Sequence, residues 1–237
     1  MQLTDLGTSY QREVQPALDA LRSAEATVAL LQAKPSGRLR LTAARELGQE
    51  LLPGVLAAFG ARYPDVAVDV DLSDRLVNLV EEGYDLALRV GPLADSALVA
   101  RRLGPPRPFG IYAGRGYLRK HGTPATPAEL AAHRCLAMTG AQSPLTWSFT
   151  SGRATSTVRI RPVLAVNSYA VLVSLARADL GIIVVPESFA AGEPLRRILP
   201  GHAPPVRQPL VVYPAARRIS PALRAMVDVL VSSVPLP

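Results

Sequence analysis

The 237 residues are enough to bury a sizeable core and could form two small domains. Although 49% of the residues are hydrophobic, no run approaches the roughly 20 apolar residues that span a bilayer, and charged residues interrupt the N-terminus where a signal peptide would lie. The formal charge of +7 comes mostly from arginines scattered singly or in pairs, which argues against a nucleic-acid-binding surface.

The first predicted element is a long helix over residues 3–33. Its apolar residues recur at alternating steps of four and three, at Leu6, Tyr10, Val14, Ala17, Leu21, Ala24, Val28 and Leu31. Such a seam needs a partner surface, which is either the rest of the same chain or a second copy, and we favour the second copy. Pro16 lies within the pattern and predicts a kink. A break at residues 34–37 then marks the first domain boundary.

The next stretch predicts a strand, a helix and a second strand. Residues 39–44 alternate and then become apolar, residues 49–59 have helical spacing, and residues 66–70 form the second strand. A βαβ unit of this kind has a right-handed crossover and belongs to a parallel sheet. Small molecules bind beyond the carboxyl ends of such strands, near helix N-termini with free backbone N–H groups. We therefore place a ligand at the turn of residues 44–46.

Shorter elements follow in a repeating order of strands and helices. We expect a short helix over 73–82, strands over 84–90, 97–103 and 109–113, and two short helices within 114–133. Beyond these we expect strands over 135–138 and 145–150, a hairpin of 157–161 with 163–166, a helix starting at 167–168, strands over 181–186 and 210–213, and a final helix over 220–231. This order fits two α/β lobes joined by two crossing segments, near residues 108 and 208, with a ligand cleft between the lobes.

Motifs for phosphate, metal or catalytic chemistry are weak or absent. Gly110, Gly114 and Gly116 lack the spacing of a dinucleotide loop and the lysine of a phosphate loop, so an ordinary turn is favoured. The three histidines lack metal-ligand spacing, and no serine lies in a Gly-x-Ser-x-Gly elbow. We therefore predict no metal, no cofactor and no catalytic residue.

Three single residues each allow more than one interpretation. Cys135, the only cysteine, excludes an internal disulfide, fits a reducing cytoplasm, and is favoured as a small buried hydrophobe. Trp147, which shares one face of a strand with Phe149, either packs in the core, which we favour, or lines the cleft. Asn167 either caps the helix that follows it or contacts a ligand with the same geometry.

Taken together, the motifs resemble the LysR-type transcriptional regulators, over their linker helix and effector-binding region. The sequence LTDLG at residues 3–7 matches the LT-x-x-G motif that opens the linker helix, and EGYDLALRVG at residues 82–91 is the most specific match. Further matches lie at residues 37–41, 52–53, 59, 63–64, 98–103, 117–118, 122–124, 167 and 181–182. The resemblance therefore covers essentially the whole chain.

The resemblance implies an α/β fold of two Rossmann-like subdomains with a cleft, similar to type II periplasmic binding proteins, after a linker and dimerisation helix at residues 1–34. Residues 37–108 with 209–237 would form subdomain I, and residues 109–208 would form subdomain II. The family implies a cytoplasmic homo-oligomer, a dimer or tetramer, that binds a small metabolite, often a carboxylate, between the subdomains.

By position, the resemblance places the ligand site at Ala44, Arg45, Glu46, Ser73, Thr139 and Asn167. Hydroxyl groups and helix-start N–H groups suit an anion, with Arg45 as a counter-charge. Glu46 departs from the small polar residue common at this position in the family, and its negative charge argues against a simple dicarboxylate. The sequence starts after the family's winged helix-turn-helix, so we expect contact with promoter DNA only through that domain, and none with a membrane.

Two other classes of function compete with that of a regulator. A transporter-associated solute-binding protein of the same fold is disfavoured by the missing export signal and by the apolar seam of the first helix. An enzyme is disfavoured because no nucleophile or acid–base pair stands out. We therefore predict an effector-sensing regulatory domain without enzymatic activity, which dimerises by packing the helix of residues 51–59 and the strand of residues 66–70 against the second lobe of its partner.

Overall fold

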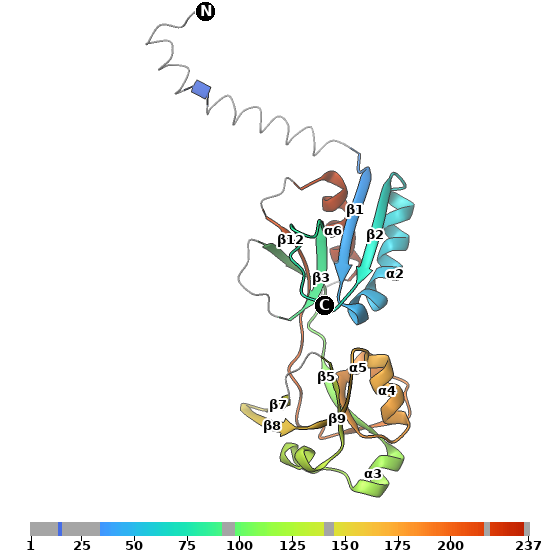
Figure 1. The fold of residues 1–237 in the computed structure, drawn as a ribbon, viewed down its shortest axis with the longest axis vertical. Helices are drawn as coiled ribbons and strands as arrows, with labels where there is room; N and C mark the ends of the chain where they lie inside the picture. The colour runs from blue at the N-terminus through green and yellow to red at the C-terminus, as the bar shows by residue number, and fades with distance from the viewer. Residues whose placement is uncertain (1–13, 16–33, 92–97, 140–144, 216–218, 235–237) are drawn as a thin grey trace, which may run out of the picture.

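The structure is a computed structural model that describes residues 14–15, 34–91, 98–139, 145–215 and 219–234 (Figure 1). The predicted helix over residues 3–33 thus lies outside the described residues, except for Val14 and Gln15, which are helical. Among the described helices, none combines the length and hydropathy of a transmembrane segment. Two five-stranded sheets, one above the other in Figure 1, organise the rest of the chain.

The first sheet has the strand order β2-β1-β3-β12-β4. Its strands are β1 (Gly37–Ala43), β2 (Val66–Leu72), β3 (Leu86–Val90), β4 (Leu98–Arg102) and β12 (Pro209–Pro214). β1 is parallel to both β2 and β3, whereas β12 is antiparallel to β3 and β4. The predicted parallel pairing of the βαβ unit is thereby confirmed.

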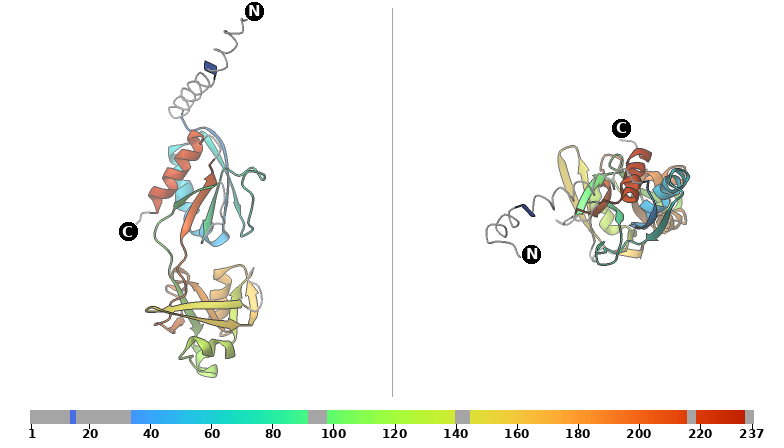
Figure 2. Two further views of the ribbon diagram at one scale, coloured as in Figure 1. Left: turned by 90° about the vertical axis from the view of Figure 1, so that its left-hand side faces the viewer. Right: turned by 90° about the horizontal axis from the view of Figure 1, so that it is seen from above.

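Two helices cover one face of the first sheet, α2 (Arg45–Arg62) and α6 (Pro221–Ser233). The left view of Figure 2 shows both helices on the same side of the sheet. The apolar residues that gave α2 its helical spacing, such as Leu52, Val55 and Phe59, are at most 3% exposed and pack against β1 and β3. Burial of this apolar stripe against the sheet is what stabilises the helix.

The second sheet has the strand order β11-β5-β10-β6-β9, and a separate hairpin joins β7 and β8. These strands are β5 (Phe109–Gly114), β6 (Cys135–Met138), β7 (Leu145–Ser151), β8 (Ala154–Ile160), β9 (Pro162–Val166), β10 (Ile182–Pro186) and β11 (Leu195–Ile198). The helices are α3 (Arg115–His121), the 3-10 helix η1 (Pro127–Ala132), α4 (Tyr169–Arg177) and α5 (Glu187–Ala190). The two short helices expected within residues 114–133 are therefore confirmed.

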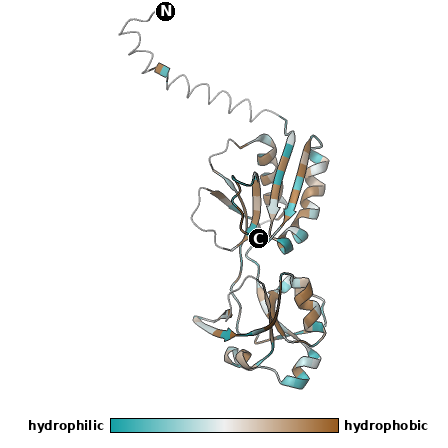
Figure 3. Ribbon diagram, viewed as in Figure 1, coloured by the Kyte–Doolittle hydropathy of each residue, from teal (hydrophilic) through white to brown (hydrophobic). Residues whose placement is uncertain are grey.

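Both faces of the second sheet are buried. Ile111 and Ile182 face a cluster formed with the β7–β8 hairpin, while Tyr112 and Ile183, their neighbours along the chain, face a cluster formed with α4. Alternate residues of a strand point to opposite faces, so two separate apolar layers result. In Figure 3 the centre of this sheet and α4 are predominantly hydrophobic.

Cys135 lies fully buried at the start of β6. Burial raises the pKa of its thiol to about 12, because the apolar surroundings disfavour the thiolate. The thiol is therefore protonated near neutral pH, and its interpretation as a small buried hydrophobe is confirmed.

The helix predicted over residues 73–82 is wrong. This segment is irregular and ends in turns at residues 79–83. The polar side chains that suggested a helix cap make other hydrogen bonds: Ser73 Oγ accepts from the N–H of Arg75, and Asp74 Oδ1 accepts from the N–H of Arg45 at the start of α2. Gly83 closes the segment with a φ of +72°, a conformation that favours glycine.

The hairpin predicted from residues 157–161 and 163–166 is also wrong. β8 pairs antiparallel with β7 instead, and β9 pairs in parallel with β6. Only Arg161 separates β8 from β9, and one residue is too short for a standard hairpin loop. The turn lies between β7 and β8, where Gly152 has a φ of +57°.

The chain crosses between the two sheets twice, along residues 103–108 and 199–208. The two crossing segments run side by side in Figure 1 and are joined by a pair of backbone hydrogen bonds. The N–H of Arg107 donates to the carbonyl of Arg207 at 2.7 Å, and the N–H of Arg207 donates back at 3.0 Å. The sheets are thus connected by a paired, two-stranded link that places both arginines beside the space between them.

Candidate functional site

A cavity of about 570 Å³ lies between the two sheets. Its lining includes all six residues predicted as ligand contacts, which are Ala44, Arg45, Glu46, Ser73, Thr139 and Asn167. Residues separated by as many as 123 positions in the sequence are therefore brought to one site. Ligand binding by these residues stays a prediction.

The strand directions explain why these residues meet. α2 starts directly after β1, Ser73 follows β2, and β1 and β2 are parallel, so both strand ends lie at one edge of the first sheet. In the second sheet, Thr139 follows β6 and Asn167 follows β9, and these two strands are also parallel. Carboxyl ends of parallel strands form the ligand crevice of open α/β sheets.

The helix N-termini at this cavity are already capped by side chains of the same protein. Asp74 Oδ1 accepts a 3.1 Å hydrogen bond from the N–H of Arg45, the first residue of α2. Glu46 Oε1 accepts a 2.7 Å hydrogen bond from the N–H of Tyr169, the first residue of α4. One N–H group at the start of each helix is therefore already occupied, and the prediction that helix-start N–H groups hold the ligand applies only to the other N–H groups.

The cap of α4 is Ser168 and not Asn167. Ser168 Oγ accepts from the N–H of Val171 at 3.5 Å, and the helix begins at the next residue. Of the two residues predicted to cap this helix, Asn167 and Ser168, the second is confirmed and the first is wrong. Asn167 is exposed and lines the cavity.

Five arginines line the cavity, which are Arg45, Arg75, Arg89, Arg107 and Arg207, against two carboxylates, Glu46 and Asp74. Arg75 forms an ion pair with Glu82, and Arg107 forms one with Glu50. Within the described ranges, the remaining three arginines have no carboxylate within ion-pair distance. The lining therefore carries an excess of positive charge.

Arg89 is the most constrained of these cations. Its guanidinium is partly buried and donates to Thr42 Oγ1 at 3.2 Å, to the carbonyl of Leu88 at 3.1 Å and to the carbonyl of Arg75 at 3.3 Å. Burial lowers the pKa of Arg89 below its usual value, while the more distant Asp74 and Asp71 act in the opposite direction. A partly desolvated cation held by neutral groups is a favourable partner for an anion.

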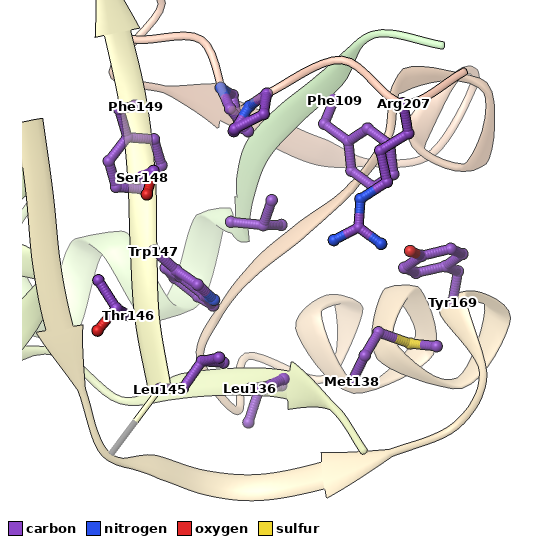
Figure 4. Close-up of a pocket in the computed structure, with 14 residues that line it drawn as sticks. Phe109, Leu136, Met138, Leu145, Thr146, Trp147, Ser148, Phe149, Tyr169 and Arg207 are labelled. Carbon is purple, nitrogen blue, oxygen red and sulfur yellow. The ribbon is translucent and has the colours of Figure 1, made fainter. Parts of the chain in front are cut away.

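A smaller apolar cavity of about 240 Å³ adjoins the first and shares four lining residues with it, Phe109, Met138, Tyr169 and Arg207. Figure 4 shows the Arg207 guanidinium extending past the ring of Phe109 towards Tyr169. The guanidinium carbon lies 5.1 Å from the centroid of the Phe109 ring, a cation–π arrangement.

The two aromatic residues of β7 differ in their surroundings. Phe149 is 0% exposed and belongs to the core. Trp147 is half-buried, packs against the same core and also lines the small cavity, so it combines the two roles that the sequence left open.

The glycines that suggested a phosphate loop have a packing role. Asp179 Oδ1 accepts a 2.9 Å hydrogen bond from the N–H of Tyr117, near the start of α3. A Cβ atom at Gly114 or Gly116 would overlap the Asp179 carboxylate. The close approach of this side chain to the backbone explains both glycines, in agreement with the predicted turn.

Several lining residues were missed from the sequence, above all Arg89, Arg207, Asp74 and Tyr169. Arg89 lies near the end of β3, whose parallel pairing with β1 puts it at the same sheet edge as Arg45. The rule that located residues 44–46 could therefore have located Arg89. Arg207 lies on a crossing segment beside the cleft, whereas nothing in the sequence indicated that Asp74 caps α2.

Comparison with known proteins gives a consistent result. A family model described as the LysR substrate binding domain matches residues 32–235. An HTH-type transcriptional regulator of Xanthomonas campestris is 33% identical over 238 residues, covering 97% of this chain and 69% of the relative. The HTH-type transcriptional regulator CrgA of Neisseria meningitidis is 31% identical over 239 residues, covering 99% of this chain and 79% of the relative.

Solved structures agree with the sequence comparisons. The structure of CrgA, described as a LysR-type transcriptional regulator from Neisseria meningitidis, is 31% identical with a TM-score of 0.73, covering 98% of this chain and 80% of that one. The separate CrgA regulatory domain is 32% identical with a TM-score of 0.72, covering 85% of this chain and all of that one. The predicted family, the two-subdomain α/β fold and the regulatory role are confirmed.

Proposed function

The chain belongs to the LysR-type transcriptional regulators and carries their substrate-binding domain, and from this premise we propose that the cavity between the two sheets is its effector site. The effector is a small anion, held mainly by Arg89 with Arg45 and Arg207 nearby. The observation that carries this proposal is the excess of arginines over carboxylates on a cavity of about 570 Å³. Ser73, Thr139 and Asn167 supply further polar contacts, and Ala44 and Glu46 complete the binding site at the start of α2.

The proposal includes the division of the chain into functional parts. Residues 1–34 form a linker and dimerisation helix, residues 37–108 with 209–237 form subdomain I, and residues 109–208 form subdomain II. The strand membership of the two sheets supports the division within residues 37–237. Effector binding shifts the population towards a state in which the subdomains are held together across the cavity, and that shift is the regulatory output.

We propose that this protein acts as a regulator in the cytoplasm and catalyses no reaction. The relatives reported above are transcriptional regulators, and this supports the proposal. The alternative of a transporter-associated solute-binding protein is not favoured, because the matching family model and the matching relatives are regulatory.

Removing one polar contact tests the effector site. We expect Ser73→Ala and Asn167→Ala each to weaken binding about fivefold, since one hydrogen bond contributes about 1 kcal/mol net. Isothermal titration calorimetry measures this change, with the tightest binder found in a thermal-shift screen of small carboxylic acids as the titrant. Thr155→Ala, an exposed hydroxyl on β8, is the matched control and should leave the affinity unchanged. Unchanged affinity in both Ser73→Ala and Asn167→Ala would show that the effector binds elsewhere.

We further propose a homodimer in which α2 and β2 of one copy contact the second subdomain of the other, with the residues 1–34 adding contacts. The exposed face of α2 supports this proposal, because it carries small residues such as Gly54, Ala57, Ala58 and Ala61 that permit close packing. We expect sedimentation velocity at micromolar concentration to give a dimer. Ala58→Arg should shift the protein towards monomer while its far-ultraviolet circular dichroism spectrum stays that of the folded chain, and a monomeric wild-type protein would contradict the proposal.

A further inference from the structure

The carboxylate of Glu46 is buried beside the cavity but only half of it is hydrogen-bonded. The residue is 7% exposed, and Oε1 accepts from the N–H of Tyr169 at 2.7 Å. Oε2 is buried and has no hydrogen-bond partner among the described residues. Glu46 lines the cavity, and this oxygen lies beneath the surface that a bound molecule would meet.

A buried oxygen without a partner is unusual in a folded protein. Buried polar atoms are almost always hydrogen-bonded, and the exceptions concentrate where a ligand or an ordered water completes the bonding. Three buried side-chain atoms without a partner occur in the described part of the chain, Arg45 Nε, Glu46 Oε2 and His202 Nδ1. The first two belong to adjacent residues that line the same cavity. Two adjacent residues of the wall therefore hold one donor and one acceptor for which the described part of the chain supplies no partner.

The capped helix N-termini restrict how an acid can bind. The N–H groups of Arg45 and Tyr169 already donate to Asp74 and Glu46, so these two groups are not available to an incoming carboxylate. Among the charged groups of the lining, the guanidinium of Arg89 suits the carboxylate best, because its present partners are a hydroxyl and two carbonyl oxygens. A plain dicarboxylate would also bring its second negative charge towards Glu46, which is unfavourable.

We propose that the effector is a small acid that also carries a hydrogen-bond donor, a hydroxyl or an ammonium group, and that this donor binds Oε2 of Glu46. The inference rests on the proposed effector site and narrows the chemical class that the site accepts to hydroxy acids and amino acids. The acid group binds Arg89, the donor binds Glu46, and Arg45 Nε–H is available to a second acceptor of the same molecule.

Matched acids test this inference on the full chain. One series consists of succinate, malate and aspartate, and a second consists of 3-phenylpropanoate, 3-phenyllactate and phenylalanine. Calorimetry on the wild-type protein should show that a hydroxy or amino acid binds at least about tenfold tighter than the unsubstituted acid of its series, as expected for a hydrogen bond to a charged group.

The variant Glu46→Gln distinguishes the roles of the two carboxylate oxygens. Glutamine keeps an acceptor for the N–H of Tyr169 but replaces Oε2 by an amide N–H₂ group, so the preference for a donor should vanish or reverse. Glu81→Gln makes the same chemical change at an exposed position outside the cavity and should keep the preference. A thermal melt shows that each variant is folded, and the comparison of acids on the wild-type protein does not depend on either variant.

The inference is overturned if no hydroxy or amino acid of the panel binds at millimolar concentration. It is also overturned if the unsubstituted acid binds as tightly as the hydroxy and amino acids of its series. A third contradicting result is a preference for hydroxy or amino acids that survives in Glu46→Gln. If the preference survives in Glu46→Gln, the hydrogen-bond partner of Oε2 is an ordered water and not the effector. Binding of unsubstituted acids that Arg89→Met abolishes would retain the proposed effector site while rejecting the donor. Binding that neither Glu46→Gln nor Arg89→Met affects would reject both the proposed effector site and the donor contact.

Discussion

Arg89→Met is expected to lower the affinity for the effector about 100-fold, which corresponds to about 3 kcal/mol. Arg89 lies near the end of β3 on the wall of the cavity, and burial lowers the pKa of its guanidinium because the charged form is partly desolvated. An anion would compensate for that desolvation, and methionine offers neither charge nor donor. The affinity should therefore fall more than it does on loss of a hydroxyl or an amide.

The free energy of unfolding should fall only moderately in the same variant, because three hydrogen bonds to neutral groups are lost but no ion pair is broken. Within the described ranges Arg89 has no carboxylate partner, so its removal leaves no charge unpaired. Calorimetry gives the affinity and thermal unfolding gives the stability. Arg101→Met is the matched control, since Arg101 is exposed, pairs with Asp228 at 3.5 Å and is not part of the cavity. Equal affinities of wild type and Arg89→Met would show that the anion binds elsewhere.

Phe59→Ala is expected to destabilise the protein by about 3–5 kcal/mol. Phe59 lies in α2, is 1% exposed, and packs into the core formed with β1, β3, β12 and α6. Its ring centroid lies 5.1 Å from that of Tyr63, the C-cap residue directly after the helix. Alanine would remove most of this buried apolar surface and leave a cavity that the surrounding strands and helices cannot fill.

Urea-induced unfolding followed by far-ultraviolet circular dichroism measures this effect. Leu76→Ala is a suitable control, because Leu76 is 89% exposed and its truncation should change the stability by less than about 0.5 kcal/mol. A loss below about 1 kcal/mol for Phe59→Ala, within the spread expected of ordinary substitutions, would contradict the packing of α2 on the first sheet.

The parts of the fold that were predictable are those in which local pattern and tertiary packing agree. α2 was recognised because its apolar positions face one sheet, although its observed start at Arg45 and its end at Arg62 extend beyond the predicted 49–59. The meeting of residues 44–46 and Ser73 at one sheet edge was predictable because the direction of β1 and β2 followed from the βαβ unit. The resemblance to the family supplied the residues from the second sheet.

The parts that failed depend on contacts between distant segments. The polar residues Ser73 and Asp74 suggested a local helix cap, but Asp74 caps α2, which starts 29 positions earlier. β8 and β9 were paired with each other because they are consecutive, whereas their partners are β7 and β6. The bond from the Tyr169 N–H to Glu46 spans 123 positions and leaves no local trace in the sequence.

The central claim is that a small acid binds between the two sheets, and a crystal structure of the protein with the tightest-binding acid of the panel tests it most directly. We predict electron density in the larger cavity, with the carboxylate within hydrogen-bond distance of Arg89 and the donor group within the same distance of Glu46 Oε2. Density for the acid outside this cavity, with the side chains of Arg89 and Glu46 unchanged, would contradict the account.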